Sequence, residues 1–177
     1  MHKNKLDQYY FIENFNQEHL SKLSNKIKII IRNYKTKNIR KLTENVKRFS
    51  KKNGYKLYLS NNFKLALKLD LDGVYIPSFN KSLSHNSYSF KKKFEILGSA
   101  HNIYELNIKE IQGVNKIFFS PVFKKKGKIL GIYGFLKLRK LTSLKSLALG
   151  GVNKDNLTQI KNLNIYGFAG INHFKKK

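Results

Sequence analysis

The stretch Ile27-Lys28-Ile29-Ile30-Ile31, with the helical pattern that follows it, decides the fold of this chain. This short apolar run predicts a buried strand. Between Ile39 and Phe49 apolar residues recur at helical spacing, so one face of a helix is apolar, and Asn53-Gly54 ends the pattern. A strand followed by such a helix is a βα unit, from which parallel sheets are built.

The same alternation continues outward in both directions. We expect eight strands, at residues 9–12, 27–31, 56–59, 73–76, 94–98, 115–119, 144–149 and 165–169. Asn16, Asn102 and Asn153 are the expected caps of three helices, and Glu105 completes a capping box with Asn102. Eight units favour a closed (β/α)8 barrel (a TIM barrel). The alternative is an open doubly wound sheet, but no glycine-rich loop follows the first strand.

Length and composition limit the other possibilities. The chain has 177 residues, fewer than the usual minimum of about 200 for such a barrel, so we expect a compact single domain over residues 1–177. Its helices after the third, sixth and eighth strands should be shortened. There is no cysteine, which excludes disulfides and thiolate metal sites. No apolar run approaches the ~20 residues of a membrane span, so we expect a cytoplasmic protein.

The formal net charge of +26 raises the question of a nucleic-acid partner. Only four of the 36 basic residues are arginine, and asparagine, isoleucine, phenylalanine and tyrosine are abundant. All these residue types have A/T-rich codons, so genome composition explains the lysines without a polyanion. No RNA-binding motif interrupts them. We therefore expect a solvated basic surface that attracts small anions, and no nucleic-acid or membrane partner.

Two glycine-containing segments follow the last two strands. They are Gly150-Gly151, ahead of Asn153, and Gly170-Ile171-Asn172. Loops after strands seven and eight of such barrels commonly bind phosphate through backbone N–H groups, and glycine lets the backbone approach the anion closely. The sequence therefore predicts a phosphate site at Gly150, Gly151, Gly170, Ile171 and Asn172. Two ordinary turns are the alternative.

Other polar residues follow further strands at the same, carboxyl end. Arg32 ends strand two, with Lys35 nearby, and a guanidinium suits a diphosphate. Ser99 and His101 end strand five, where the serine can bond a substrate and the histidine can act as acid or base. Lys128 closes a lysine-rich run after strand six that can fold over phosphates.

Five segments together resemble the thiamine-phosphate synthase family, which includes the TenI-like thiazole tautomerases. They run in order along nearly the whole chain: residues 65–74, Leu97-Gly98-Ser99-Ala100-His101-Asn102, Phe119-Ser120-Pro121-Val122-Phe123, Ala148-Leu149-Gly150-Gly151-Val152 and Gly167-Phe168-Ala169-Gly170-Ile171. The family joins a hydroxymethylpyrimidine diphosphate to a thiazole phosphate and releases diphosphate, assisted by Mg²⁺.

The resemblance assigns roles to six residues. Arg32 matches a diphosphate-binding arginine, Ser99 a pyrimidine-site serine and Lys128 a diphosphate-binding lysine. The thiazole-phosphate site falls on Gly151, Ile171 and Asn172, although the family usually has serine at the last position. By this resemblance the chain is a thiamine-phosphate synthase, a diphosphorylase-type transferase whose ligands are phosphorylated small molecules.

The diphosphate half departs from the family pattern. The substituted positions are Ile30 for glutamine, Tyr34 for lysine, Ser60-Asn61 for Asn-Asp, Asn80 near the place of a second acidic residue, and Lys125 and Gly127 for threonines. The two lost carboxylates are the family's magnesium ligands. Glu13 is the only carboxylate that we place in a loop at the carboxyl ends, so Mg²⁺ would have a weakened site.

Two other functions remain open. A thiazole tautomerase needs the phosphate site and a proton-transfer group, for which His101 is the candidate, but no diphosphate or metal. A non-catalytic binder of a phosphorylated ligand, or of RNA through the lysines, is the third possibility.

Overall fold

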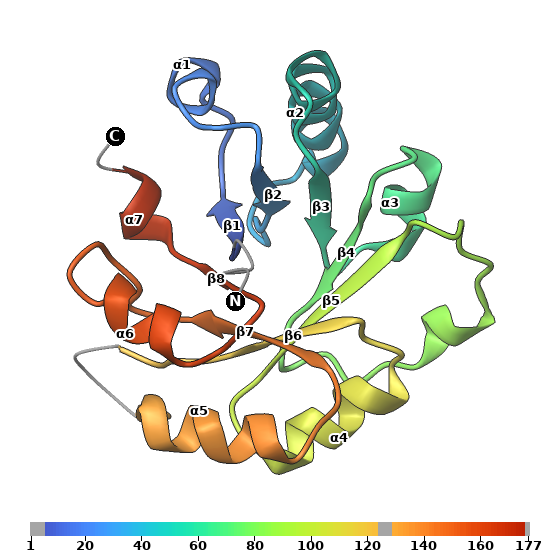
Figure 1. The fold of residues 1–177 in the computed structure, drawn as a ribbon. Helices are drawn as coiled ribbons and strands as arrows, with labels where there is room; N and C mark the ends of the chain where they lie inside the picture. The colour runs from blue at the N-terminus through green and yellow to red at the C-terminus, as the bar shows by residue number, and fades with distance from the viewer. Residues whose placement is uncertain (1–5, 124–128, 176–177) are drawn as a thin grey trace.

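The strands form one closed parallel barrel (Figure 1) in the computed structural model, which describes residues 6–123 and 129–175. Each strand pairs in parallel with the next, and β1 pairs with β8, so the closed (β/α)8 architecture is confirmed and the open sheet is excluded. The strands are β1 Asp7–Ile12, β2 Ile27–Ile31, β3 Leu57–Ser60, β4 Gly73–Ile76, β5 Glu95–Ala100, β6 Lys116–Phe119, β7 Lys145–Leu149 and β8 Gly167–Ala169.

Helices follow seven of the eight strands. They are α1 Gln17–Ser21, α2 Ile39–Asn53, α3 Phe63–Lys68, α4 Ile103–Ile111, α5 Gly131–Lys140, α6 Leu157–Asn162 and α7 Ile171–Lys175. Between β4 and β5 there is only a 3₁₀ turn, η1, at Ser84–Ser87. Shortened helices after β3 and β8 were expected and are present.

The expectation of a shortened helix after β6 was wrong, because α5 has 10 residues. Gly131 and Gly134 weaken its helical signal in the sequence. Packing overrides that weakness: Phe135 is fully buried and meets Phe119 edge-on at 5.7 Å between ring centroids. Instead of the helix after β6, the helices after β1 and β7, α1 and α6, are short.

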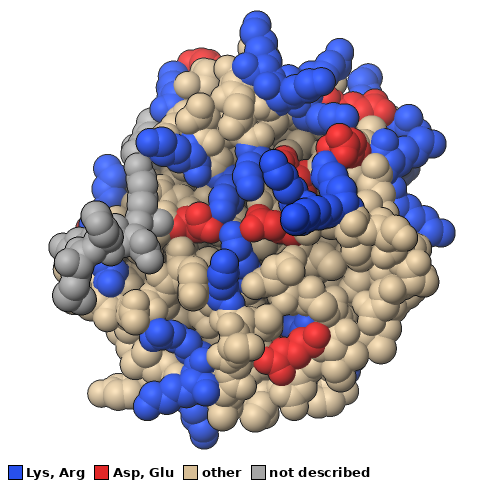
Figure 2. Space-filling view, turned by 45° about the vertical axis from the view of Figure 1, so that its right-hand side comes forward, with Lys and Arg blue, Asp and Glu red and all other residues tan. Residues whose placement is uncertain are grey.

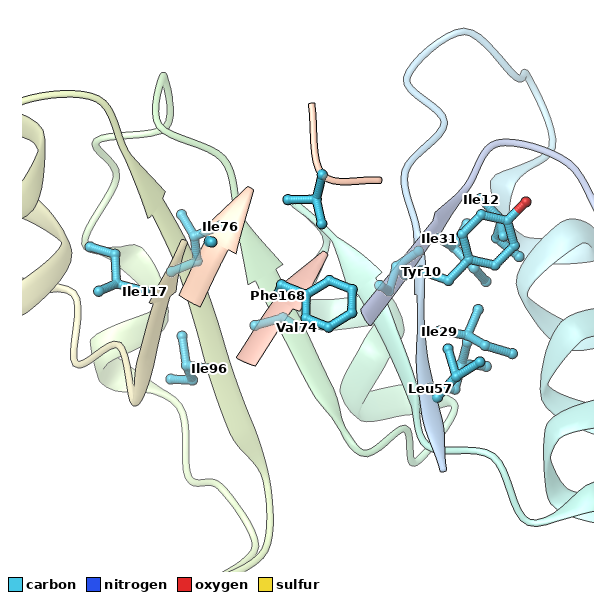
Figure 3. Packing of buried hydrophobic residues seen from close by; sticks show 14 of the residues in the cluster. Tyr10, Ile12, Ile29, Ile31, Leu57, Val74, Ile76, Ile96, Ile117 and Phe168 are labelled. Carbon is cyan, nitrogen blue, oxygen red and sulfur yellow. The ribbon is translucent and has the colours of Figure 1, made fainter. Parts of the chain in front are cut away.

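Two apolar cores hold the barrel. Along β1, Tyr9 and Phe11 point into the barrel, and Tyr10 and Ile12 point outward to the helices. Phe118 joins the interior aromatic group, at 5.2 Å from the ring of Tyr9. Figure 3 shows part of the outer core, in which aliphatic side chains of neighbouring strands pack together. This two-sided burial explains why the strands read as nearly continuous apolar runs.

The expected helix caps were partly right. Asn16 accepts a hydrogen bond from the backbone N–H of His19 at 2.9 Å, and Asn102 accepts one from Glu105 N–H at 2.9 Å. The carboxylate of Glu105, however, reaches the N–H of His101. Asn153 does not cap α6: its side chain accepts from residues 155 and 156 in a turn that precedes the helix.

The amino end of the barrel is closed by a compact ion cluster. Lys116 bonds both Asp7, at 3.0 Å, and Glu95, at 2.8 Å, and Lys28 bonds Asp7 at 2.7 Å. The hydroxyl of Tyr58 donates to Glu95. Burial alone raises the pKa of both carboxyl groups, but hydrogen bonds from the lysines and, for Glu95, from Tyr58 bring their net pKa below the usual values.

Basic residues far outnumber acidic ones, 36 against 10. Figure 2 shows one face on which lysine and arginine side chains crowd around a few carboxylates. Within the described part of the chain, no helix is both long and apolar enough to cross a bilayer.

Candidate active site at the carboxyl end of the barrel

A pocket of about 450 Å³ opens at the carboxyl ends of β1 and β2. It brings together three residues singled out from the sequence: Arg32, Glu13 and Ile171. Phe11 lies in its wall and His19, from α1, also faces it. Residues far apart in the chain meet here because parallel barrel strands all end on the same side.

Arg32 is positioned by an aromatic ring. Its guanidinium carbon lies 4.8 Å from the ring centroid of Phe11, within cation–π range, and its backbone N–H bonds Ile12 O at 2.8 Å. Within residues 6–123 and 129–175 it makes no ion pair with a carboxylate. A half-buried, oriented and uncompensated guanidinium is suited to bind an anion.

Lys35 lies on the loop that follows. Its backbone N–H donates to Asn33 Oδ1 at 2.9 Å, and its side chain is exposed. Asn33 Nδ2 in turn donates to Glu13 O at 2.9 Å, which ties the loops after β1 and β2 together. Lys35 therefore adds an exposed positive charge on the loop that follows Arg32.

Ser99 points into the top of the barrel. It is 3% exposed and its Oγ accepts a hydrogen bond from the hydroxyl of Tyr75 at 2.8 Å. Burial raises the pKa of Tyr75 to about 12, so this phenol stays a neutral donor. Ser99 therefore keeps its own proton free to donate to a ligand.

His101 is exposed beside the same strand end. Its Nδ1 lies 2.5 Å from the carbonyl oxygen of Ser120, which can only accept. The proton therefore sits on Nδ1, which leaves Nε2 unprotonated in the neutral ring. This tautomer suits a group that takes up a proton.

The two adjacent glycines after β7 have different surroundings. Gly150 has φ 92°, and a Cβ there would lie 2.7 Å from Cα and Cβ of Pro121. Gly151 has φ 77° and is exposed. Gly150 is thus explained by packing against the β6 loop. At Gly151 the carbonyl oxygen accepts from Asn156 Nδ2 at 2.9 Å, and the missing side chain lets an anion approach the backbone N–H.

Gly170 follows β8 directly. Its N–H bonds Tyr9 O at 3.4 Å, and a Cβ would lie 3.0 Å from the Cβ of His173 and 3.1 Å from Val152 O. Helix α7 begins at the next residue, Ile171, which is half-buried in the pocket wall. Asn172 is thus the second residue of α7. Lys128, the other expected site residue, lies outside the described residues.

The expected metal positions carry amides. Asn80 Nδ2 donates to Asn61 Oδ1 at 2.5 Å, so the two side chains bond each other. Mg²⁺ is usually held by one or two carboxylates. Among the described residues no group of three or more His, Cys, Asp or Glu side chains gathers, and Glu13 lacks a carboxylate partner in the pocket. These residues do not fit a magnesium site.

The loop that carries Asn80 is anchored by a buried lysine. Lys109, on α4, is fully buried and donates to Asn80 O at 2.7 Å and to Gln112 Oε1 at 2.8 Å. Gln112 Nε2 also bonds Asn80 O and Ser82 O, at 3.1 and 2.8 Å. Burial lowers the pKa of Lys109 to about 8.

Residues 10–174 match the family described as thiamine monophosphate synthase. The chain belongs to this family. The match begins within β1 and ends within α7, so the resemblance inferred from five segments is confirmed.

Named thiamine-phosphate synthases are among its relatives. One from Prochlorococcus marinus is 36% identical over 61% of this chain, and the matched part makes up only 32% of that relative. A putative thiamine-phosphate synthase 2 from Aquifex aeolicus is 27% identical over 79% of this chain and 77% of its own length. The solved thiamine phosphate pyrophosphorylase from Pyrococcus furiosus has a TM-score of 0.76 at 20% identity, covering 96% and 87% of the two chains, which supports the fold.

Three residues in and around this candidate site were not found from the sequence. Tyr75 looked like an ordinary strand residue, Phe11 like core, and Lys109 like one lysine among many. Each acts through a partner distant in the chain: Ser99, Arg32 and Asn80 respectively. No local signal marks such pairs.

Proposed function

We propose that this chain is a thiamine-phosphate synthase, which joins a hydroxymethylpyrimidine diphosphate to a thiazole phosphate to give thiamine phosphate and diphosphate. The observation that carries the proposal is the uncompensated Arg32, held against Phe11 at the mouth of the barrel in a chain that matches the family over residues 10–174. The cytoplasmic location stays a prediction.

Each residue then has a task that follows from its chemistry. The C–O bond to the diphosphate breaks with its electron pair on the leaving oxygen, so cationic groups beside it lower the barrier. Arg32 and the exposed charge of Lys35 supply that positive potential. Ser99 offers a hydroxyl to the pyrimidine. The backbone of Gly151 and the start of α7 at Ile171 are suited to the thiazole phosphate.

The test is product formation by the purified protein from both substrates, followed by mass spectrometry of thiamine phosphate. Arg32→Met should lower kcat/KM at least about tenfold, the cost of one charged hydrogen bond. Arg40→Met is the matched control, because Arg40 lies on α2 in an exposed pair with Glu44. No product at high enzyme concentration, with and without Mg²⁺, would refute the proposal.

A thiazole tautomerase is the second candidate, and one observation favours it. His101 is held in the tautomer that leaves Nε2 ready to accept a proton, and this activity needs neither diphosphate nor metal. His101→Ala should then abolish tautomerisation. Unchanged turnover in that variant would remove His101 from this role.

A further inference from the structure

The pair formed by Asn61 and Asn80 stands where the family resemblance leads one to expect magnesium ligands. We propose that this neutral amide pair replaces the carboxylate ligands of a divalent cation, so that the chain binds a diphosphate group without Mg²⁺. The inference rests on the proposed function only in that the diphosphate belongs to the substrate of that reaction.

The first argument is chemical complementarity. Asn80 Nδ2 donates to Asn61 Oδ1 at 2.5 Å. Both amides are neutral, so the pair has no charge that a cation would have to neutralise. Two carboxylates in the same place would repel each other unless a cation lay between them. The amides therefore close this edge of the barrel without a cation.

The second argument is that the hydrogen-bonding groups of Asn80 are already used. Its Oδ1 accepts from Ser82 N–H at 2.8 Å and its backbone N–H donates to Pro77 O at 3.1 Å. Its carbonyl oxygen accepts from Lys109 and Gln112. Both oxygens of Asn80 therefore already accept hydrogen bonds from groups of the protein.

The third argument is the local charge. Arg32 follows β2 and makes no ion pair with a carboxylate of the described chain, and Lys35 lies on the same loop. Lys109 adds a buried cation behind Asn80. Arg32 and Lys35 on the β2 side, with Lys109 behind Asn80, supply the positive potential that a bound Mg²⁺ would otherwise supply.

Tyr34 closes the same edge from the β2 side. Its hydroxyl lies 2.6 Å from Ser60 Oγ, and its ring meets Phe79 edge-on at 5.8 Å. Ser60 and Phe79 are the neighbours in sequence of Asn61 and Asn80. The loops after β2 and β4 and the end of β3 are thus joined by direct side-chain contacts.

The experiment measures binding of inorganic diphosphate to the whole chain by calorimetry, once with MgCl₂ and once with EDTA. We expect the two dissociation constants to differ by less than about threefold. A dissociation constant at least about tenfold weaker in EDTA would overturn the proposal, as would absence of binding in both conditions.

A second measurement restores the carboxylates. The double variant Asn61→Asp/Asn80→Asp should acquire Mn²⁺ binding, seen in water proton relaxation, and its diphosphate affinity should become at least about tenfold dependent on Mg²⁺. Asn107→Asp/Asn162→Asp is the control, since both asparagines are exposed and the change in net charge is the same. Mn²⁺ binding by the unaltered chain, or no gain in a folded double variant, would contradict the proposal.

The outcomes separate the inference from the function. If diphosphate binds independently of metal but no thiamine phosphate forms, the synthase function is refuted and the amide-pair proposal stands. Product formation only with Mg²⁺ would keep the synthase and refute the amide pair. If the double variant fails to fold, the comparison of MgCl₂ with EDTA on the unaltered chain still decides.

Discussion

The amino and carboxyl ends of this barrel differ in whether their cations form ion pairs with carboxylates. At the amino end, Lys28 and Lys116 are each bonded to carboxylates of Asp7 or Glu95, so two positive charges meet two negative ones. At the carboxyl end, Arg32 is held by an aromatic ring and no described carboxylate neutralises it. A cation that is compensated within the protein stabilises the fold, whereas an uncompensated one is available to a ligand.

The difference in ion pairing between the two ends, and not the net charge of +26, indicates which end can bind an anion. Lysine and arginine side chains crowd part of the face in Figure 2, yet number alone does not make a binding site. The carboxyl end is distinguished by the fixed orientation of its polar side chains. One neighbour holds each of them: Phe11 holds Arg32, Tyr75 holds Ser99 and Asn80 holds Asn61. Fixed polar groups lose little entropy when a ligand binds.

The largest effect should come from breaking the amino-end cluster. Lys116→Met leaves Asp7 and Glu95 without their shared partner and should lower the free energy of unfolding by about 3 kcal/mol. Urea unfolding measures it. Lys145→Met is the control, since Lys145 is the register neighbour of Lys116 on β7, is exposed and makes no ion pair in the described chain. Equal losses in both variants would refute the special role of the cluster.

The next effect tests the two glycines of the carboxyl end. Gly150→Ala should cost about 2 kcal/mol of stability, because the new Cβ meets Pro121 and φ is in the left-handed region. Gly151→Ala should cost about 1 kcal/mol, from φ alone, and should weaken phosphate binding. Thermal unfolding and phosphate titration of both variants check this, and the reverse order of stability losses would contradict it.

A smaller effect should separate binding from stability. Arg32→Met should weaken inorganic diphosphate binding about tenfold, or about 1.4 kcal/mol, and change the free energy of unfolding by less than about 0.5 kcal/mol. Calorimetry and urea unfolding on the same preparation measure the two quantities. A large loss of stability would show that Arg32 belongs with the structural cations of the amino end.

The smallest effect concerns pH and the two buried lysines. The folded pKa of Lys109, about 8, lies below its unfolded value, so the unfolded chain holds the extra proton in between and stability should rise as pH increases above 8. The gain relative to Lys109→Met should be at most about 1.4 kcal/mol per pH unit. Urea unfolding at a series of pH values measures it, and parallel curves for the two proteins would contradict it.

Lys116 should behave in the opposite way. Burial alone lowers its pKa, but the charges and hydrogen bonds of Tyr9, Glu95 and Asp7 outweigh burial and raise it. A raised lysine pKa stabilises the fold fully below the usual lysine range and loses that contribution only above it. The cluster should therefore weaken in strong alkali, and also in acid, where Asp7 and Glu95 become protonated.

The sequence predicted most of the backbone well. β2 and β4 begin and end at the expected residues, and the other strands differ by at most two residues at either end. These strands are buried on both faces, so apolar runs mark them clearly. α5 and the Asn153 cap were misjudged, because glycine and asparagine propensities are weak local signals that packing of Phe135 and a turn at Asn156 override.

For the candidate site, the sequence by itself determined which residues follow each strand: Arg32, Ser99, His101 and the glycines all lie at the carboxyl end because parallel strands share a direction. Only the tertiary structure decided what each one touches. Asn61 bonds Asn80 across 19 positions and Lys116 bonds Asp7 across 109, and such contacts depend on barrel closure rather than on local pattern. The sequence determined where the charged residues lie along the chain, whereas the fold determined which of them form ion pairs.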